Sequence, residues 1–504
     1  MRDTWPLFAV AAARMLVHLL TNSQYGVHRD ELATFDDAHY LAWGYVAYPP
    51  LTPFIARVAM VLLGYSLPGV RFFGALALCA AIVFTGLMAR EMGGKRLAQV
   101  TAALAVAIAP VSILWGALFQ YTAFDYLWWV LAAYFTARLL RSEDPRWWLG
   151  IGIAVGLGLM TRYTMGFLAL GITGAVLLTP ARRYLRSPWL WAGVGAAVVI
   201  FLPNILWQAR HDFISAEFLR YLHARDVRIG RTSDFLPNQF FVPANAFTAP
   251  LWAAGLWYYF ATPAGKRFRL LGWMFFIPFL MFALAKGRDY YTAGSYPMLF
   301  AGGAVWWERL LANRRQVSWL KFAYPLLICL LGAVFAPMLA PVLPVETYIR
   351  YQNALGFAPP KTEVGHVGPL PQHFGDRFGW PEMVQQVAQI YNNLPAEERA
   401  RTGIYANNYG EAGAIDFFGP QYGLPKAISP HQSYYLWGPR DYTGDSLIVL
   451  QSKRADAERN CKNVEAVGTV GHPLSMAEEH YTIFICRGLK QPLPELWPRL
   501  KHWN

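Results

Sequence analysis

The chain has 504 residues, of which 55% are hydrophobic and only 15% are charged, and its mean hydropathy is +0.25. This composition excludes a soluble protein of several ordinary domains, because such proteins carry about 25% charged residues. The net charge of +13 does not indicate nucleic-acid binding, because most of it lies in short basic loops between apolar segments. We therefore expect a polytopic membrane protein.

Apolar segments that approach the length needed to cross a bilayer, about 20 residues, recur from the N-terminus to about residue 341. We predict about eleven transmembrane helices, an odd number that places the two termini on opposite sides of the membrane. The predicted spans are residues 5–20, 70–89, 97–114, 124–140, 147–160, 164–179, 189–207, 241–261, 270–285, 292–310 and 319–339. Residues 1–344 are accordingly predicted to form the transmembrane domain, with a first outward loop at residues 21–69.

The basic loops predict the orientation of these spans. The segments that follow alternate spans are REMGGKR, RSEDPR, ARRYLRS, GKRFR and RLLANRRQVSWLK. Because short cytoplasmic loops retain Lys and Arg, we expect this side, which includes the N-terminus, to be cytoplasmic. The first apolar run lacks a convincing cleavage site and is expected to be a retained signal anchor. The first loop and the C-terminal segment are then expected to face outward.

The first outward loop has an unusual mixture of acidic, aromatic and proline residues, GVHRDELATFDDAHYLAWGYVAYPPLTPF. The alternation of apolar and acidic residues predicts a helix that lies in the membrane interface and ends at Pro49, Pro50 and Pro53. Asp30 and Glu31 stand at its start. They are interpreted either as a solvated acidic N-terminus, which the helix dipole favours, or as catalytic carboxylates.

Asp36, Asp37 and His39 invite a metal-site interpretation, because carboxylate and imidazole groups share divalent ions. Their spacing matches no ligand template, so a bound metal is not expected and no cofactor is firmly implied. The chain also lacks a glycine-rich phosphate loop at a strand-to-helix turn, which argues against the use of a cytosolic nucleotide sugar.

Several basic residues are predicted on the outer side, against the general charge trend, namely Arg29, Arg162, Lys286 and Arg288. Further arginines occupy residues 208–231, where an amphipathic helix is expected either on lipid headgroups or against the substrate. Arg14 lies inside the first apolar segment. A charge there is costly, so we expect it to pair with a carboxylate or a backbone carbonyl inside the helix bundle.

Residues 345–504 are predicted to form a soluble periplasmic α/β domain. Strand-like runs such as TGIYAN, SLIVLQS and YTIFICR alternate with the helix-like WPEMVQQVAQIYNNL. Tyr409, Glu411 and His431 are candidate contacts to an acceptor, although a packing or assembly domain is an equally good interpretation. Cys461 and Cys486 lie in this domain, and the sequence leaves open whether they form a disulfide.

Four segments occur in an order that resembles a known class of enzyme. They are DELATFDDAHYLAWGYVAYPPLTP, TRYTMGF, KGRDYYTAGSYPMLFAGGA and the C-terminal set RFGWPEMV, NNYGEAGAIDFFG and ISPHQSYYLWGP. The chain resembles the GT-C class of membrane glycosyltransferases, in particular the protein O-mannosyltransferase, aminoarabinose transferase and Rgt-like superfamily. The resemblance implies an α-helical polytopic membrane fold and transfer of a sugar from a polyprenyl-phosphate donor to a glycolipid, polysaccharide or protein of the cell envelope.

The resemblance also implies roles for individual residues. In such enzymes an aspartate of the first outward loop acts as the catalytic base, and here the match falls on Asp30, with Glu31 beside it. A carboxylate within about 3 Å of an acceptor hydroxyl can take its proton as the oxygen attacks the anomeric carbon. The transfer is accordingly expected to invert the anomeric configuration.

The donor phosphate is expected to bind Lys286 and Arg288, next to Tyr290 and Tyr291, although the two cations could instead extend toward the interface without binding substrate. Further expected substrate contacts are Arg29, His39, Tyr40, Tyr48 and Arg162. Several relatives carry Lys before the Pro-Pro-Leu turn where this chain has Tyr48. Another residue must therefore hold the phosphate here.

Two alternatives remain at this level. A transporter or flippase of a lipid-linked substrate would often show internal repeats and ionisable groups near the membrane midplane, and no convincing repeat is visible. A ligase of lipid-linked polysaccharide would be expected to place its chemistry on a late outward loop. The sugar, the acceptor and the oligomeric state are not specified by these patterns.

Overall fold

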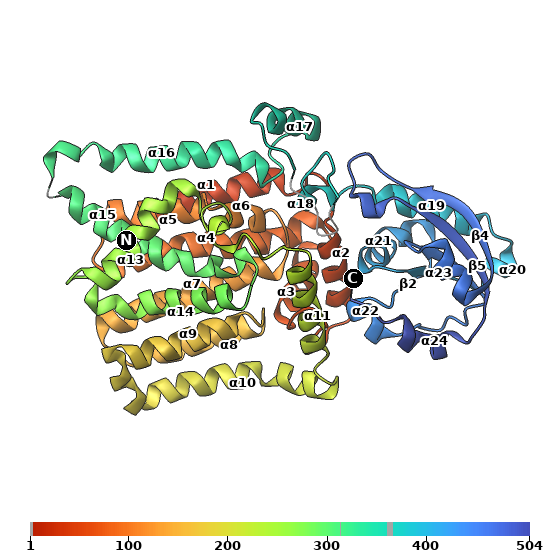
Figure 1. The fold of residues 1–504 in the computed structure, drawn as a ribbon, viewed down its shortest axis with the longest axis horizontal. Coiled ribbons are helices and arrows are strands. Elements are labelled where there is room, and N and C mark those ends of the chain that lie inside the picture. Colours follow the sequence, from red (N-terminus) through yellow and green to blue (C-terminus); the bar gives the residue numbers. More distant parts are fainter. Residues whose placement is uncertain (1–3, 313, 360–365, 504) are drawn as a thin grey trace. The chain divides into compact units, whose positions relative to one another are not determined.

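The computed structural model describes residues 4–312, 314–359 and 366–503, and most of them are helical (Figure 1). The chain divides into two compact units. The helical unit consists of Met1–Gln24, Tyr48–Phe213 and His223–Leu343, and the sheet unit consists of Tyr25–Ala47, Ile214–Leu222 and Pro344–Asn504. The segment 25–47 of the first loop therefore packs with the C-terminal part of the chain.

The helical unit is built from α-helices joined by short turns and single 3₁₀ turns. Its α-helices are α1 (Trp5–Thr21), α3 (Leu51–Leu63), α4 (Leu67–Glu91), α5 (Arg96–Ala107), α6 (Pro110–Gly116), α7 (Tyr121–Ser142), α8 (Trp147–Leu159), α9 (Met165–Leu178), α10 (Pro188–Arg210), α12 (Phe235–Asn238), α13 (Ala249–Ala261), α14 (Arg269–Leu284), α15 (Tyr296–Ala312) and α16 (Leu320–Phe335). Helix α11 (Ile214–Arg228) contributes residues to both units. The 3₁₀ helices are η1 (Pro180–Arg186), η2 (Ala246–Thr248), η3 (Lys266–Phe268), η4 (Asp289–Ser295), η5 (Arg315–Val317) and η6 (Ala336–Met338).

Several of these helices are suited to a bilayer. Among the described residues, four are long and apolar enough to cross it, namely Leu67–Glu91, Pro188–Arg210, Lys266–Leu284 and Leu320–Met338. Two bent pairs raise the number to six, and three shorter apolar helices are α1, α3 and α8. The count of about eleven spans thus stays a prediction.

One predicted span is broken. Residues 97–114 form α5 and α6, which meet at an angle of 62°. The break falls at Ala109, whose extended backbone (ψ 131°) precedes Pro110. Proline disfavours the helical conformation of the residue before it and supplies no amide hydrogen of its own, so the helix stops and restarts there.

Arg14 of α1 is buried, and its Nη2 donates to the carbonyl of Ser112 across 3.3 Å. The expectation that this buried charge finds a carboxylate or carbonyl partner is confirmed. The contact ties α1 to α6, two helices far apart in the sequence.

Helices α8 and α10 lie side by side (Figure 1). Glycine residues permit this close approach. A Cβ atom on Gly152 would lie 2.0 Å from the carbonyl oxygen of Gly193, and one on Gly193 would lie 2.3 Å from that of Trp148. Small residues that let two backbones approach are typical of helix pairs in membranes.

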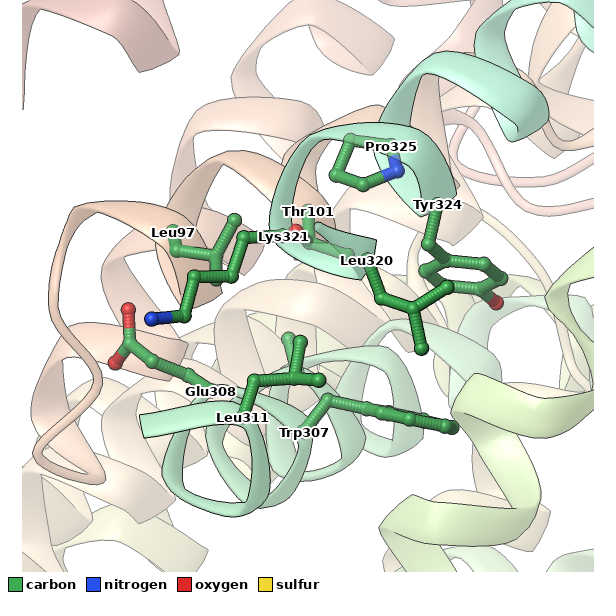
Figure 2. A pocket seen from close by; sticks show the side chains of 10 residues that line it. Leu97, Thr101, Trp307, Glu308, Leu311, Leu320, Lys321, Tyr324 and Pro325 are labelled. Atoms are coloured by element: carbon green, nitrogen blue, oxygen red, sulfur yellow. The ribbon is translucent and has the colours of Figure 1, made fainter. Parts of the chain in front are cut away.

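A mostly apolar groove lies between α5, α15 and α16 (Figure 2). It is lined by Leu97, Thr101, Ala304, Trp307, Glu308, Leu311, Leu320, Lys321, Tyr324 and Pro325. The carboxylate of Glu308 accepts hydrogen bonds from the backbone amides of Lys95 (2.6 Å) and Ala98 (3.0 Å), which begin α5. None of the lining residues is a predicted site residue, and the role of Glu308 is to cap this helix.

The sheet unit contains a five-stranded sheet in the order β2-β1-β3-β5-β4. Its strands are β1 (Thr402–Ala406), β2 (Ala427–Ile428), β3 (Ser446–Leu450), β4 (Cys461–Val470) and β5 (Tyr481–Leu489). Strand β1 is parallel to β2 and β3, and β5 is antiparallel to β3 and β4. The fully buried run SLIVL of β3 suits a central strand covered on both faces. The runs TGIYAN, SLIVLQS and YTIFICR supply β1, β3 and β5.

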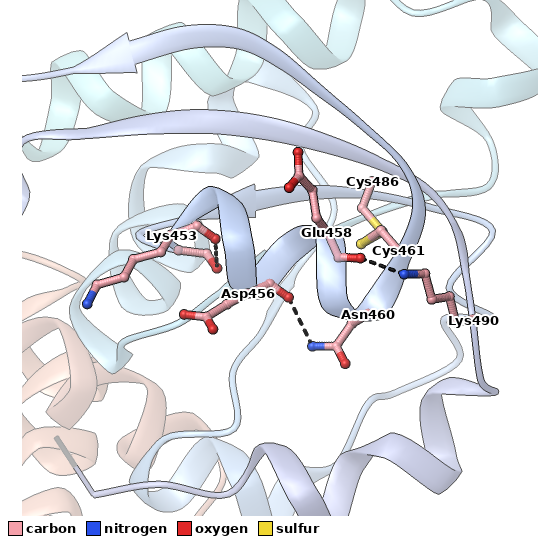
Figure 3. The surroundings of a disulfide bond; sticks show 8 residues. Lys453, Asp456, Glu458, Asn460, Cys461, Cys486 and Lys490 are labelled. Atoms are coloured by element: carbon pink, nitrogen blue, oxygen red, sulfur yellow. Dashed lines mark hydrogen bonds between the residues drawn. A yellow bond between two sulfur atoms is a disulfide. The ribbon is translucent and has the colours of Figure 1, made fainter.

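The helices of the sheet unit precede, connect and follow these strands. They are α2 (Arg29–His39), α17 (Val345–Ala354), α18 (Gln372–Gly375), α19 (Trp380–Asn392), α20 (Ala396–Arg399), α21 (Tyr409–Phe418), α22 (Gln432–Trp437), α23 (Arg454–Asn460) and α24 (Leu493–Leu500), with the 3₁₀ turns η7 (Gly419–Tyr422) and η8 (Ala477–Glu479). Cys461 of β4 and Cys486 of β5 form a disulfide, with Cα atoms 5.6 Å apart (Figure 3). This answers the question of pairing that the sequence left open.

The prediction that the helix of the first loop continues to the proline turn is wrong. Helix α2 ends at His39, and seven of its eleven residues are buried. It packs against α21 within the sheet unit. The same alternation of apolar and acidic residues serves here to bury one helix against another, and the buried carboxylate of Asp36 accepts a hydrogen bond from Tyr434 of α22.

Candidate active site

Helix α2 begins with a capping box. His28 is the N-cap, and its Nδ1 accepts from the backbone amide of Asp30 (3.1 Å), while the backbone amide of His28 donates to Oε2 of Glu31 (2.9 Å). Such a box satisfies amides that a helix start leaves without partners. Glu31 is fully buried, so its carboxylate stabilises the start of the helix.

Asp30 has a different environment from its neighbour. Its side chain is 39% exposed, whereas Glu31 is 0% exposed. Oδ1 of Asp30 accepts a hydrogen bond of 2.6 Å from the hydroxyl of Tyr409, the first residue of α21. Oδ2 lies 3.9 Å from Nδ1 of His28. Adjacent helical residues point about 100° apart, and Asp30 is the one of the two that reaches solvent.

Arg29 lies in a buried group of carboxylates. Its guanidinium is 3.9 Å from Oδ2 of Asp376 and 3.9 Å from Oε1 of Glu479. Burial raises the pKa of Asp376 to about 7, although Arg29 acts in the opposite direction. Burial raises the pKa of Glu411 to about 7 and that of Glu479 well above its usual range, where repulsion from Glu411 adds to the effect.

The remainder of α2 is anchored by aromatic residues. The hydroxyl of Tyr434 donates to Oδ2 of Asp36, and the rings of Phe35 and Phe417 stack at 5.3 Å. Within the part of the chain that the structure describes, no three His, Cys, Asp or Glu residues are grouped as metal ligands would be.

Two predicted substrate contacts lie at the C-terminal end of α2. His39 is exposed, and its Nδ1 lies 2.9 Å from the carbonyl of Phe35, one helical turn earlier. The hydroxyl of Tyr40 accepts from Nη1 of Arg440 (3.1 Å), and its ring lies against Trp437 at 4.8 Å. Both residues thus have contacts within the sheet unit.

Arg162 stands in the turn between α8 and α9. The turn is held by Thr161, which accepts from the indole of Trp128 (3.0 Å) and donates to the carbonyl of Leu157 (2.8 Å). The Arg162 guanidinium is buried and lies 3.6 Å from Oδ2 of Asp125.

Three aromatic rings surround this guanidinium. Its central carbon lies 4.5 Å from the ring centre of Tyr291, 5.0 Å from that of Tyr121 and 5.4 Å from that of Tyr290. Such faces attract a cation and restrict its rotation.

Arg288 contacts Tyr290, one of the three tyrosines around Arg162. Its Nη1 donates to the hydroxyl of Tyr290 (3.0 Å), and its Nε donates to Oδ2 of Asp226 (2.6 Å). Burial opposes ionisation of Tyr290, but Arg288, Arg162 and Arg231 together lower its pKa. The helical unit therefore concentrates positive charge around one phenol.

Two other predicted residues, Tyr48 and Lys286, differ in their relation to this cluster. The ring of Tyr48 is 5.5 Å from that of Tyr121, so Tyr48 belongs to the aromatic wall. Lys286 is exposed, with φ of +50°, whereas Arg288 is 9% exposed. Of the two cations expected to bind phosphate, only Arg288 is part of the buried cluster.

The predicted site residues thus fall into two groups, each within one unit. Asp30, Glu31 and Arg29 lie with α21 in the sheet unit, and Arg162, Arg288, Tyr290, Tyr291 and Tyr48 lie in the helical unit. The sequence analysis did not identify Asp125 and Asp226, the carboxylates that orient the two arginines. The first group offers a proton acceptor, and the second offers donors and positive charge for an anion.

Comparison with known proteins adds family information to this geometry. Residues 47–207 match the family described as dolichyl-phosphate-mannose-protein mannosyltransferase. The match includes Tyr48 and Arg162, but not Asp30 or Arg288. Lipid A galacturonosyltransferase RgtD of Rhizobium johnstonii is 28% identical over 232 residues, which cover 43% of this chain and 48% of that protein.

A second relative is the undecaprenyl phosphate-alpha-4-amino-4-deoxy-L-arabinose arabinosyl transferase 1 of Pseudomonas fluorescens. It is 25% identical over 353 residues, which cover 63% of this chain and 61% of that protein. The chain therefore spans about half the length of the first relative and 61% of the second.

The fold is similar to a solved structure over nearly its whole length. The crystal structure of ArnT from Cupriavidus metallidurans bound to undecaprenyl phosphate has a TM-score of 0.59 and 14% identity, and the match covers 96% of this chain and 98% of that one. Sequence relatives and fold together confirm the resemblance to GT-C glycosyltransferases of the aminoarabinose transferase and protein O-mannosyltransferase type.

Proposed function

We propose that this chain, a relative of these GT-C enzymes, transfers a sugar from a polyprenyl-phosphate donor to a hydroxyl group of a cell-envelope acceptor. The observation that carries the proposal is the carboxylate of Asp30, which is partly exposed and hydrogen-bonded at the start of α2. The named relatives use or bind undecaprenyl-linked substrates or modify lipid A, which supports a lipid-linked donor.

In the proposed reaction Asp30 accepts the proton of the acceptor hydroxyl as its oxygen attacks the anomeric carbon of the donor. The bond between that carbon and the phosphate oxygen breaks, and the electron pair leaves with polyprenyl phosphate. Attack on the face opposite the leaving group inverts the anomeric configuration. Phosphate is a good leaving group, so the step needs no general acid.

We propose Arg162 and Arg288 as the residues that bind the donor phosphate. Each is held in one orientation by a carboxylate, Asp125 or Asp226, and both contact Tyr290. A guanidinium presents five N–H donors and pairs well with phosphate oxygens. Positive charge placed where the leaving group develops its negative charge lowers the barrier to its departure.

We also propose an orientation of the protein in the membrane. The alternation of basic loops favours a cytoplasmic N-terminus, with residues 345–504 and the first loop on the outer side of the bacterial cytoplasmic membrane. Polyprenyl-linked sugars and lipid A-like acceptors meet the protein there. Residues 345–504, proposed as an α/β domain, would contact the acceptor.

The test is sugar transfer by the purified protein in lipid nanodiscs, supplied with a panel of polyprenyl-phosphate sugars and envelope acceptors. Asp30→Asn should lower the transfer rate at least about a hundredfold, because loss of a general base typically costs 10²–10⁴ in rate, while undecaprenyl phosphate still binds. Glu31→Gln is the matched control, because a glutamine oxygen can still accept from the His28 amide. It should retain transfer within a few-fold of wild type.

Equal transfer by wild type and Asp30→Asn would remove the assignment of the base. A large loss in Glu31→Gln with a normal melting temperature would transfer the role to Glu31.

A further inference from the structure

The hydroxyl of Tyr409 donates a hydrogen bond of 2.6 Å to Oδ1 of the Asp30 carboxylate. Tyr409 is 9% exposed and opens helix α21. The two residues are 379 positions apart in the sequence, so this contact forms only when the first-loop segment has packed with the C-terminal part of the sheet unit.

Tyr409 acts as the donor in this pair. Burial raises the pKa of Tyr409 well above its usual value, and the nearby Asp30 raises it further, against the effect of Arg29. The phenol therefore keeps its proton at neutral pH, and an ionised carboxylate only accepts. The N-terminus of α21, where Tyr409 stands, adds the positive end of a helix dipole.

We infer that Tyr409 is a positioning residue for Asp30, which fixes the side-chain rotamer of the proposed base. This inference rests on the proposed function. A base whose side chain is fixed by a third group reacts more efficiently than one that rotates, as in other catalytic constellations. The catalytic carboxylate of the first loop is thus completed by a residue that the sequence places near the other end of the chain.

Other contacts hold α2 in place without this hydroxyl. Tyr434 donates to Asp36, the rings of Phe35 and Phe417 stack, and α21 approaches closely at Gly413, where a Cβ would lie 2.8 Å from that of Leu32. Removal of the Tyr409 hydroxyl should therefore leave the helix where it is and change only the carboxylate.

The charged and titratable groups around Asp30 include His28, Arg29 and Asp376, with Glu479 3.9 Å from Arg29. His28 lies 3.9 Å from Oδ2 of Asp30, Arg29 precedes it, and Asp376 is 3.7 Å from Nε2 of His28. These groups remain in a Tyr409→Phe protein. A hydrogen bond to a carboxylate favours its ionised form, so its loss should move the acidic limb of the kcat profile toward higher pH.

The test compares Tyr409→Phe with Tyr434→Phe in the nanodisc transfer assay, from pH 4.5 to 8. Each change removes one buried hydroxyl that donates to a carboxylate of α2. The partner of Tyr409 is Asp30, the proposed base, whereas the partner of Tyr434 is Asp36. Tyr409→Phe should lower kcat about tenfold, move the acidic limb to higher pH, and leave the donor KM within about twofold. Tyr434→Phe should leave the acidic limb of the kcat profile at the same pH as in wild type.

A double variant separates this inference from the proposed function. In the Asp30→Asn background, Tyr409→Phe should cost nothing further, because residues that act as a unit are not additive. Suppose that Asp30→Asn abolishes transfer, but Tyr409→Phe has the kcat of wild type and the same acidic limb in its kcat–pH profile. The inference about Tyr409 is then wrong, while the assignment of Asp30 as the base stands. If Asp30→Asn is fully active, the proposed base itself fails.

Should Tyr409→Phe not fold, 3-fluorotyrosine at position 409 provides the same comparison, because it keeps the ring and makes the hydroxyl a stronger donor. Its acidic limb should then move to lower pH. A limb identical to that of wild type would overturn the inference.

Discussion

Arg288 and Lys286 are separated by one glycine yet differ in environment. Asp289 fixes the turn, because its Oδ2 accepts from Nδ2 of Asn238 (2.6 Å) and its Oδ1 accepts from the amide of Tyr290 (2.8 Å). Arg288 is buried against Asp226 and Tyr290, whereas Lys286 is exposed. A buried, oriented guanidinium binds phosphate with less loss of side-chain freedom than a mobile ammonium.

We therefore expect Arg288→Gln to raise the donor KM about 10- to 100-fold, the range that follows from losing a hydrogen bond between charged groups. Lys286→Gln is the control and should change the donor KM by less than about threefold. Steady-state kinetics with varied polyprenyl-phosphate sugar would check both. Equal effects of the two changes would contradict the choice of Arg288. Arg288→Gln alone would leave the buried carboxylate of Asp226 without its partner. The double variant Arg288→Gln with Asp226→Asn avoids this.

At the residue scale the sequence allowed a partial prediction of the site. The resemblance to GT-C enzymes singled out Asp30. The basic and aromatic residues predicted on the outer side singled out Arg162, Arg288, Tyr290 and Tyr291. Their partners could not be singled out, because those contacts join residues 37 to 379 positions apart.

The role of Glu31 was recognisable in principle. A glutamate three residues after a helix start predicts a capping box. Here the N-cap is His28 in place of the usual Ser or Thr, which hides the pattern.

At the scale of elements, close helix packing depends on single glycines. The pair α8 and α10 meets backbone to backbone at Gly152 and Gly193. Gly195, two residues further along α10, has no heavy atom within 4 Å of where its Cβ would lie. The two positions therefore predict opposite responses to the same added methyl group.

Gly152→Ala should force α8 and α10 apart and destabilise the protein by roughly 1–3 kcal/mol, the usual cost of overpacking. Gly195→Ala should be neutral or stabilise slightly, because alanine favours the helix by up to about 1 kcal/mol. Thermal unfolding in detergent would compare them with wild type. The packing argument fails if Gly152→Ala melts at or above the temperature of Gly195→Ala.

Element boundaries were predictable where local chemistry decides them and not where packing does. The break between α5 and α6 follows from Pro110 alone. The end of α2 at His39 does not, because residues 40–48, YLAWGYVAY, contain no proline and the first proline after the helix is Pro49. The helix stops at the C-cap Tyr40, which leaves the helical conformation (ψ 62°) and contacts Arg440 and Trp437.

At the scale of the whole molecule, buried carboxyl groups link stability to pH. Glu411 faces Glu479, Glu478, Arg29 and Tyr481. Its pKa of about 7 lies above the ordinary value of 4.5, so the folded protein binds more protons than the unfolded chain between these pH values. The stability that this group contributes is fully present below about pH 4.5 and is lost as the pH rises through about 7.

The unfolding temperature of the wild-type protein should accordingly fall as the pH rises from 5 to 8. The slope from Glu411 is about 1.4 kcal/mol per pH unit within that window. Glu411→Gln should flatten the dependence, because glutamine does not titrate. Differential scanning fluorimetry at constant ionic strength would measure both. A variant curve parallel to that of wild type would exclude Glu411 as a source of the dependence.

The class of the molecule was the easiest property to predict. Composition and the succession of apolar segments indicate a polytopic membrane protein, and the motif order indicates a resemblance to the GT-C class, which the comparisons confirm. The association of residues 25–47 with the C-terminal part was not predictable, because it depends on packing between segments more than 300 residues apart.

The most direct test of the account is the fate of a radiolabelled polyprenyl-phosphate sugar in nanodiscs and in sealed proteoliposomes that contain the protein. Glycosyl transfer predicts that glycosylated acceptor and free polyprenyl phosphate appear in equal amounts, only when acceptor is present. Movement of intact donor across the proteoliposome bilayer, with no glycosidic bond formed to any acceptor, would contradict it and identify a transporter of the lipid-linked substrate.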